Sequence, residues 1–124
     1  MSKLGGVPWA KYKGELHIPS YNFCGPNTSL KDRISENDQP TEGNSPINQT
    51  DAVCYKHDLA YREAGDNLDK KHKADKIMIQ ELDQVKPNSF KEKIIKSLIS
   101  TTMKGKVKLG LGLVVMPLEY RNFI

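Results

Sequence analysis

Residues 54–61 read CYKHDLAY and bring a thiol, an imidazole, a carboxylate and a phenol into one short segment. On an α-helix, four of these side chains occupy positions i, i+3, i+4 and i+7 and share one face: Cys54, His57, Asp58 and Tyr61. A helix face that only packs against a core carries Leu, Ile or Val there, whereas this one carries groups that titrate, bind metal ions and hydrogen-bond. The segment therefore predicts a helix whose polar face has a chemical role.

Length and composition limit the chain to one modest domain. It has 124 residues, of which 37% are hydrophobic, and a mean hydropathy of −0.60, so part of it is expected to form loops. The net charge of +4 and an isoelectric point near 9.0 favour acidic partners. Anionic lipid head groups, nucleic acid and acidic protein surfaces all fit, and charge does not choose among them.

The two ends show no targeting or membrane-spanning pattern. The N-terminal stretch MSKLGGVPWAKYKGE has no apolar segment behind its first lysine and so predicts no signal peptide. The longest mostly apolar run, residues 109–118, is about half of the roughly 20 residues that a membrane-crossing helix needs. A soluble chain is expected, with residues 1–17 as an N-terminal arm and residues 105–124 as a basic, Gly-rich and then apolar tail. The tail is interpreted as a membrane-seeking segment, a linker or flexible chain.

The first long helix is predicted around the CYKHDLAY segment. Asn48 is its expected N-cap, with Thr50 as the alternative, and it runs to about Ala64 and ends at Gly65. A second helix follows within a few residues. Because the link at residues 65–68 is short, the two helices are expected to be antiparallel neighbours.

Two further helices follow from the apolar spacing. The second helix begins at Asn67 or Asp69, and its apolar stripe consists of Ala74, Ile77, Met78, Leu82 and Val85. The third begins at a capping box, SFKE at residues 89–92, and its apolar face consists of Phe90, Ile94, Ile95, Leu98 and Ile99. Core packing is the preferred interpretation of that face, and lipid docking is the alternative.

His57 and Asp58 point about 100° apart around their helix, so they suit two adjacent tasks. His57 can face a substrate as a general base while Asp58 faces a cation. A neutral imidazole needs a partner that fixes its tautomer, and Asp75 in the apolar stretch KADKIM is the candidate on the next helix. A solvent-facing His-Asp pair is the alternative that local spacing leaves open. His17 and His72 stand alone and are interpreted as solvated side chains.

Residues 23–27, FCGPN, predict a tight turn that can present main-chain carbonyls to Ca²⁺, which prefers oxygen ligands. A disulfide between Cys24 and Cys54 would hold this turn near Asp58. The alternative is a plain surface turn with two unrelated thiols. A zinc site is disfavoured because its candidates lack the paired spacing of zinc ligands: Cys24, Cys54, His57 and His72.

Three segments carry a family resemblance: YNFCGPN at residues 21–27, HDLAY at 57–61 and KAD at 73–75. Together they resemble the phospholipase A2 superfamily, most closely the short phospholipase A2-like domains of parvoviral capsid proteins and arthropod genomes. The resemblance implies a mainly α fold with a domain over residues 18–104. Two antiparallel helices would carry the active site, beside a calcium-binding loop and an additional C-terminal helix.

The resemblance also implies roles for individual residues. His57 would activate a water molecule, Asp75 would orient and stabilise its imidazole, and Tyr61 would support Asp75 by a hydrogen bond. The N–H of Gly25 would help to hold the oxyanion. The implied cofactor is Ca²⁺, and its ligands would be the carboxylate of Asp58 and the main-chain carbonyls of Phe23, Gly25 and Asn27.

Two further implications concern the loop. Secreted phospholipases join the calcium loop to the catalytic helix by a disulfide, and Cys24 and Cys54 stand at those two positions. Asn27 occupies a position that is usually glycine. Asparagine can adopt the required backbone conformation, at some cost in strain or calcium affinity.

The function that this resemblance implies is calcium-dependent hydrolysis of the sn-2 ester of glycerophospholipids. The expected setting is a parvovirus- or densovirus-like capsid protein, held inside the virion and exposed during entry to breach the endosomal membrane. The expected partners are a phospholipid membrane with an anionic surface and the rest of the capsid; a host-encoded relative would be secreted or cytosolic. The alternative is a weakly active or inactive calcium- and lipid-binding module. No specific nucleic-acid partner is expected, because the lysines are spread over all segments and aromatic residues are sparse.

Overall fold

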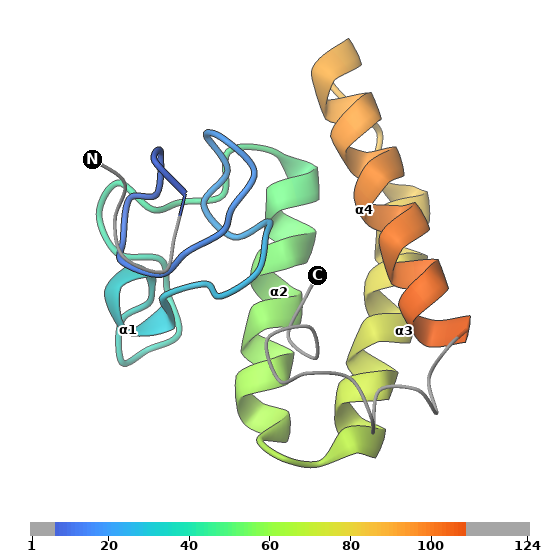
Figure 1. Ribbon diagram of the computed structural model, residues 1–124, viewed down its shortest axis with the longest axis horizontal. Coiled ribbons are helices and arrows are strands. Elements are labelled where there is room, and N and C mark those ends of the chain that lie inside the picture. The colour runs from blue at the N-terminus through green and yellow to red at the C-terminus, as the bar shows by residue number, and fades with distance from the viewer. Residues whose placement is uncertain (1–6, 109–124) are drawn as a thin grey trace.

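The chain folds into an irregular N-terminal region followed by three long helices (Figure 1). The structure, a computed structural model, describes residues 7–108. Its helices are α1 (Leu30–Arg33), α2 (Gln49–Ala64), α3 (Leu68–Gln84) and α4 (Phe90–Lys108), and these described residues form no strand. The predicted mainly α fold is confirmed. Within the same residues, no helix has the length and apolar character needed to cross a bilayer.

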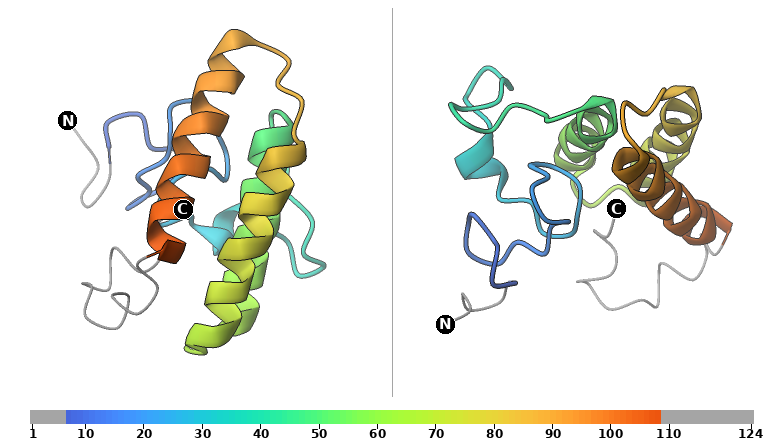
Figure 2. Two further views of the ribbon diagram at one scale, coloured as in Figure 1. Left: turned by 90° about the vertical axis from the view of Figure 1, so that its right-hand side faces the viewer. Right: turned by 90° about the horizontal axis from the view of Figure 1, so that it is seen from above.

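The α2–α3 hairpin forms as its cap residues predict, with the two helices side by side and antiparallel (Figures 1 and 2). Asn48 caps α2 by accepting the N–H of Asp51, and Thr50 lies inside the helix, so the alternative cap is wrong. Gly65 ends α2 with a φ of 58°. The side chain of Asn67 caps α3 in the same way as that of Asn48 caps α2.

The apolar stripe of α3 enters the core except at one position. Ile77 is 44% exposed, whereas the other predicted members are buried: Ala74, Met78, Leu82 and Val85. Ile77 and Met78 are adjacent, so their side chains point about 100° apart. The core takes Met78, and the prediction that Ile77 is buried is wrong.

Glu92 ties the start of α4 to the start of α2. The predicted capping box is present in its first half, because the hydroxyl of Ser89 accepts the N–H of Glu92. The carboxylate of Glu92 does not return to Ser89; it accepts from the N–H of Asn88 and from the hydroxyl and N–H of Thr50. These bonds fix which face of α4 turns inward.

Only part of the predicted apolar face of α4 is buried. Ile99 and Met103 lie in the core and Ile95 packs against it. Three predicted members are instead exposed by 75%, 51% and 57%, respectively: Phe90, Ile94 and Leu98. Core packing was therefore the wrong interpretation for these three. Helix α4 also continues through residues 105–108, which the sequence pattern placed in the tail, and residues 109–124 lie outside the described part.

A buried ion pair anchors the N-terminal region. Glu15 and Arg33 are joined by two hydrogen bonds of 2.7 Å, and Glu15 also accepts the N–H of Ser29. His17 is 4% exposed and packs against the backbone of Gly25, so its interpretation as a solvated side chain is wrong. An isolated histidine in a sequence carries no sign of such packing.

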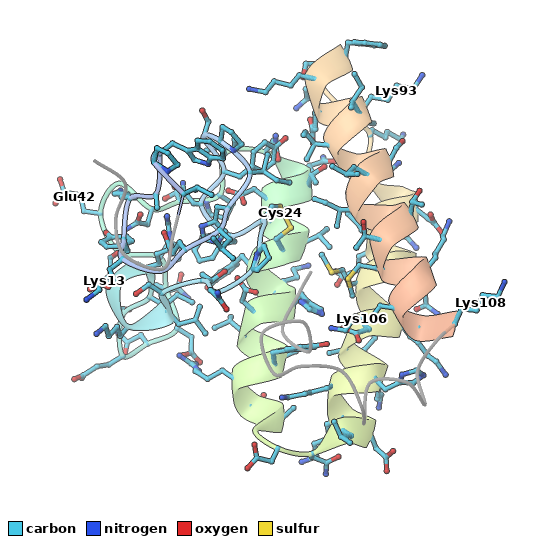
Figure 3. All side chains as sticks on the ribbon, in the orientation of Figure 1. Lys13, Cys24, Glu42, Lys93, Lys106 and Lys108 are labelled. Carbon is cyan, nitrogen blue, oxygen red and sulfur yellow. A yellow bond between two sulfur atoms is a disulfide. The ribbon has the colours of Figure 1, made fainter. Side chains whose placement is uncertain are left out.

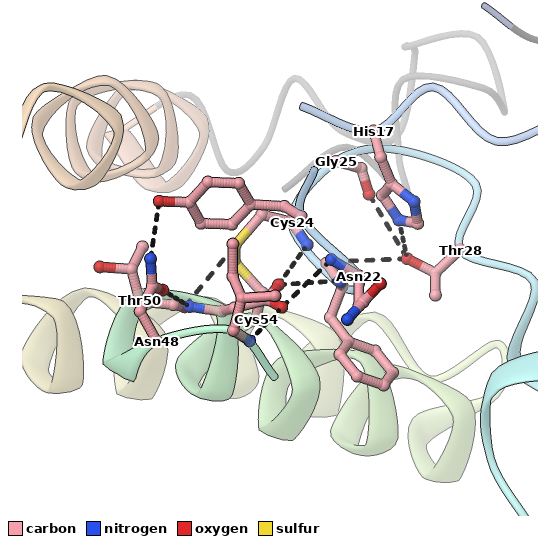
Figure 4. The surroundings of a disulfide bond; sticks show 12 residues. His17, Asn22, Cys24, Gly25, Thr28, Asn48, Thr50 and Cys54 are labelled. Atoms are coloured by element: carbon pink, nitrogen blue, oxygen red, sulfur yellow. Dashed lines mark hydrogen bonds between the residues drawn. A yellow bond between two sulfur atoms is a disulfide. The ribbon is translucent and has the colours of Figure 1, made fainter. Parts of the chain in front are cut away.

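A disulfide joins Cys24 in the loop to Cys54 on α2, with the two Cα atoms 5.1 Å apart (Figure 4). Both residues are fully buried. The predicted disulfide is confirmed, and the alternative of two unrelated thiols is wrong. The zinc alternative loses two of its candidate ligands, because a disulfide sulfur is not a thiolate.

Candidate active site

His57 of α2 and Asp75 of α3 form a buried pair. Nε2 of His57 lies 2.7 Å from Oδ1 of Asp75, and the two side chains are 1% and 0% exposed. A carboxylate only accepts, so Nε2 carries the hydrogen and Nδ1 keeps its lone pair. Nδ1 is buried and has no hydrogen-bond partner among residues 7–108. Burial lowers the pKa of His57 against the opposing effect of Asp75, so the imidazole is a neutral proton acceptor at pH 7.

Tyr61 supports the same carboxylate from one turn further along α2. Its hydroxyl donates to Oδ1 of Asp75 over 2.6 Å, and its ring centroid lies 4.3 Å from that of His57. Burial and the charge of Asp75 raise the pKa of Tyr61. The phenol therefore remains a hydrogen-bond donor across the physiological range.

Lys106 of α4 reaches the same group and was missed by sequence reasoning. Its ammonium donates to the hydroxyl of Tyr61 and lies 3.5 Å from Oδ2 of Asp75, and its side chain is 4% exposed. The spacing held a signal, because Lys106 follows Ile99 and Met103 at helical intervals on the buried face of α4. The sequence analysis predicts a tail over residues 105–124, and this prediction leaves Lys106 outside the helix.

The carboxylate of Asp51 holds the loop on α2, next to the half-cystine Cys24. Oδ1 accepts the N–H groups of Phe23 and Cys24 at 2.8 and 3.2 Å. Oδ2 accepts those of Asn22 and Ile47, both at 3.1 Å. The Cys24 N–H and the Phe23 carbonyl belong to one planar peptide group and point in opposite directions. Fixing that N–H therefore also fixes the direction of a predicted calcium-binding carbonyl.

Two loop residues have left-handed backbone conformations. Gly25 has a φ of 136°, and a Cβ there would lie 2.4 Å from the Cα of His17, so only glycine fits. Asn27 has a φ of 61°. The prediction that asparagine adopts a glycine-like conformation at this position is confirmed.

Asp58 faces this loop, and its surroundings fit Ca²⁺. It lines the same cavity as Thr28, whose hydroxyl lies 3.5 Å from the carbonyl oxygens of both Phe23 and Gly25. Oδ2 of Asp58 is buried without a hydrogen-bond partner in the described residues, and burial raises the pKa of Asp58 well above its usual value. A cation would relieve that unfavourable burial, and the surrounding oxygens are hard donors of the kind that Ca²⁺ prefers.

The fit is to a site with a single carboxylate. Across the part of the chain that the structure describes, no three His, Cys, Asp or Glu side chains gather into a metal-binding group. Neutral oxygens must therefore supply the remaining ligands, which is the arrangement that the sequence resemblance implies for Asp58 and the loop carbonyls.

Gly25 lines two adjoining cavities of different character. One, of about 460 Å³, is lined by polar and charged side chains that include Asp58, Tyr61, Arg62 and Lys71. The other, of about 240 Å³, is mostly apolar and is lined by residues that include Leu16, Ile18, Leu98 and Ile99. An apolar slot next to a polar cavity suits an amphiphilic ligand with a hydrocarbon chain and a charged head group.

Comparison with known proteins gives one family. No curated protein and no solved structure matches the chain. Residues 14–102 match the family described as "Phospholipase A2-like domain". The match includes the disulfide, the loop and the His57–Asp75 pair, and it ends before Lys106. Because it spans most of the sequence, the chain belongs to the phospholipase A2-like domain family.

Proposed function

We propose that the protein is a calcium-dependent phospholipase A2 that uses water to hydrolyse the sn-2 ester of glycerophospholipids. One observation carries the proposal: Nδ1 of His57 is an unpartnered proton acceptor, while Nε2 is held by Asp75. The next residue, Asp58, directs a carboxylate at the loop, where an ester and its phosphate can be bound. Membership of the family supports a phospholipase A2 type of activity.

The reaction needs a proton acceptor, groups that orient this acceptor, and a hydrogen-bond donor that stabilises the negative charge of the oxyanion. His57 takes the proton of the attacking water at Nδ1, and Asp75 and Tyr61 hold the imidazole and stabilise its charged form. The N–H of Gly25 is the candidate donor to the oxyanion, because Gly25 lines the same polar cavity as Asp58 and Tyr61. Water attacks the ester directly, so these residues form no acyl-enzyme.

Calcium would be held by Asp58 and by the main-chain carbonyls of Phe23, Gly25 and Asn27. Bound there, it would supply Lewis-acid polarisation of the ester carbonyl and charge for the substrate phosphate. The hydroxyl of Thr28 lies 3.5 Å from two of these carbonyls, and Thr28 lines the same cavity as Asp58, so the proposed ligands lie close together.

The substrate is proposed to be met at a membrane surface. The outer stripe of α4, defined as Phe90, Ile94 and Leu98, is exposed, and Leu98 also lines the apolar cavity beside Gly25. Lys91 and Lys93 are exposed next to this stripe. An apolar stripe flanked by lysines complements a bilayer with anionic lipids, and its continuity with the cavity gives a fatty chain a route toward the loop.

The proposed biological setting is the capsid protein of a parvovirus- or densovirus-like virus. The domain would lie inside the virion and act on the endosomal membrane during entry, with the rest of the capsid as a partner. The resemblance of the loop and of the two helix segments to parvoviral domains supports this setting. In a host-encoded protein the same chemistry would operate in a secreted or cytosolic enzyme.

The second candidate is a calcium- and lipid-binding module of the same fold with little turnover. Asn27 favours it, because asparagine lines the polar cavity at a loop position where the resemblance implies glycine. The complete His57–Asp75 pair opposes it, because binding alone needs no general base.

Vesicles of phospholipids with different fatty acids at sn-1 and sn-2 separate the two candidates. We expect release of the sn-2 fatty acid alone, with calcium and not with excess chelator. If excess chelator does not change the release of fatty acid, the metal role of Asp58 is contradicted. If the protein binds calcium but releases no fatty acid, it is the binding module instead.

A further inference from the structure

Lys106 is a buried cation in a site whose proposed chemistry does not use it. Figure 3 shows it on the side of α4 that faces the other helices, whereas Lys93 and Lys108 extend away from the molecule. The residue is 8% exposed, and its ammonium touches groups on both other long helices, Tyr61 on α2 and Asp75 on α3. A lysine is rarely buried to this degree without a specific charged or hydrogen-bonding partner.

The hydrogen bonds around Asp75 run in one direction, toward its carboxylate, and Lys106 occupies the acceptor side of the Tyr61 hydroxyl. An ammonium group only donates, so Lys106 donates to the oxygen of Tyr61. The hydrogen of Tyr61 is then left to donate to Oδ1 of Asp75, which also accepts from Nε2 of His57. The hydrogen bonds of Tyr61 and His57 therefore both end on Oδ1 of Asp75, and Nδ1 of the neutral His57 is unprotonated.

Lys106 also compensates the second oxygen of Asp75. Oδ2 is buried and accepts no hydrogen bond within residues 7–108, and the ammonium 3.5 Å away is the positive charge beside it. The Tyr61 ring lies under the same ammonium, 4.7 Å from Nζ to the centroid, with Lys71 of α3 at 5.6 Å from that ring. Lys106 thus places a positive charge beside the Asp75 carboxylate and also fixes the Tyr61 hydroxyl that donates to it.

We propose that Lys106 is a positioning residue of the active site, which holds the Tyr61 hydroxyl and the Asp75 carboxylate in place and so keeps the imidazole of His57 in its working orientation. The proposal rests on the proposed function for its effect on turnover, but its effect on the surroundings of the His57 imidazole does not. It makes α4, including residues beyond the matched family range of 14–102, part of the catalytic apparatus. Lys106 touches no reacting atom and acts through Tyr61 and Asp75.

The test compares Lys106→Met, which keeps the length and loses the charge, with Lys106→Arg, which keeps the charge. The matched control is Lys104→Met, because Lys104 lies on the same helix, is exposed and faces Asp83 at 3.9 Å. Kinetics use a soluble short-chain phospholipid with saturating calcium. Calcium affinity by calorimetry and thermal denaturation are measured for every variant.

We expect Lys106→Met to lower kcat roughly 10- to 100-fold, the usual effect of losing a partner that orients an active-site group. KM and calcium affinity should stay near their wild-type values, Lys106→Arg should recover most of the loss, and Lys104→Met should be unchanged. Unchanged kcat in folded Lys106→Met would overturn the proposal, as would a loss that Lys106→Arg does not recover at all. Should Lys106→Met not fold, Lys106→Gln takes its place under the same criteria.

A second readout is independent of activity. Imidazole ¹⁵N chemical shifts report which nitrogen of His57 carries the hydrogen. We expect the Nε2–H form in both proteins, because Asp75 accepts that hydrogen in each. The Nε2 resonance should shift in Lys106→Met, because the charge beside Asp75 is lost, and identical spectra would overturn the proposal. If the wild type hydrolyses no phospholipid, the proposed function fails while this spectrum still decides the role of Lys106.

Discussion

The catalytic role of His57 depends on its protonation state, which the surrounding residues bias toward neutral. Burial lowers the pKa of His57 from 6.5, and the opposing effect of Asp75 is smaller. Activity should therefore be lost only as the pH falls through this lowered pKa, so that the acidic limb of kcat/KM lies below pH 6.5. A rate profile with a soluble substrate at saturating calcium measures this. A midpoint above that value would contradict His57 as the base.

Asn27 holds a left-handed conformation that other side chains tolerate poorly. Asn27→Ala should lower the free energy of unfolding by about 1 kcal/mol, because alanine has no polar group to stabilise positive φ. Asn27→Gly should stay within a few tenths of a kcal/mol of the wild type, because glycine adopts this conformation freely. Chemical denaturation without calcium tests both. Equal stability of the two variants would show that backbone conformation is not what selects asparagine here.

Residues whose partners lie nearby in sequence could be predicted, and those with distant partners could not. Helical spacing placed Cys54, His57, Asp58 and Tyr61 on one face, and the short hairpin link brought Asp75 level with His57. The role of Lys106 arises from contacts between segments far apart in the chain. No local pattern encodes which distant hydroxyl or ammonium will meet a buried carboxylate.

The loop is attached to α2 through the disulfide and through the hydrogen bonds of Asp51. Reducing the disulfide leaves those hydrogen bonds in place, so the contribution of the disulfide can be measured by itself. The disulfide closes a loop of 30 residues in sequence separation, which on the chain-entropy model stabilises the fold by about 3–4 kcal/mol. Calorimetry with and without reductant should show a lower Tm after reduction, and calcium titration should show weaker binding. If the Tm is unchanged in protein that is verified to be reduced, the hydrogen bonds of Asp51 alone are sufficient to hold the loop on α2.

The outer stripe of α4 should matter for membranes and not for chemistry. Phe90→Ser and Ile94→Ser should reduce hydrolysis of anionic vesicles roughly tenfold or more, since each removes an apolar side chain from the proposed lipid contact. Hydrolysis of a soluble short-chain substrate should not change. Ile77→Ser is the matched control, because Ile77 is similarly exposed but lies on α3. Equal losses on both substrates would exclude this stripe as a lipid-binding surface.

Helix positions could be predicted better than helix rotations. The capping residues Asn48, Gly65 and Asn67 mark the ends of α2 and α3 correctly, because capping is a local interaction. The rotation of α4 depends on tertiary bonds, with Glu92 on Thr50 at one end and Lys106 on Tyr61 at the other. Apolar spacing alone could not show that these polar groups turn Phe90, Ile94 and Leu98 outward.

At acidic pH, the stability of the whole domain should depend on the ion pair between Glu15 and Arg33. Burial alone would raise the pKa of Glu15, but the hydrogen bonds from Arg33 and the Ser29 N–H, with His17 3.5 Å away, lower it from 4.5 to about 2. The unfolded chain therefore binds this proton first, and about 3 kcal/mol of stability should be lost as the pH falls from near 4.5 to near 2. Denaturation midpoints of the wild type and Glu15→Gln across this range isolate the contribution. If the denaturation midpoints of the two proteins fall in parallel with pH, the predicted contribution of Glu15 is wrong.

The fold brings loop, disulfide and three helices to one point, and the claim that unites them is that His57 activates water for ester hydrolysis. The most direct test is the rate of sn-2 fatty acid release by wild type and His57→Gln, both loaded with calcium and both verified as folded by circular dichroism. We predict that the substitution lowers the rate by a factor of about 10² to 10⁴, with calcium affinity retained. Near-wild-type release by His57→Gln would contradict the account.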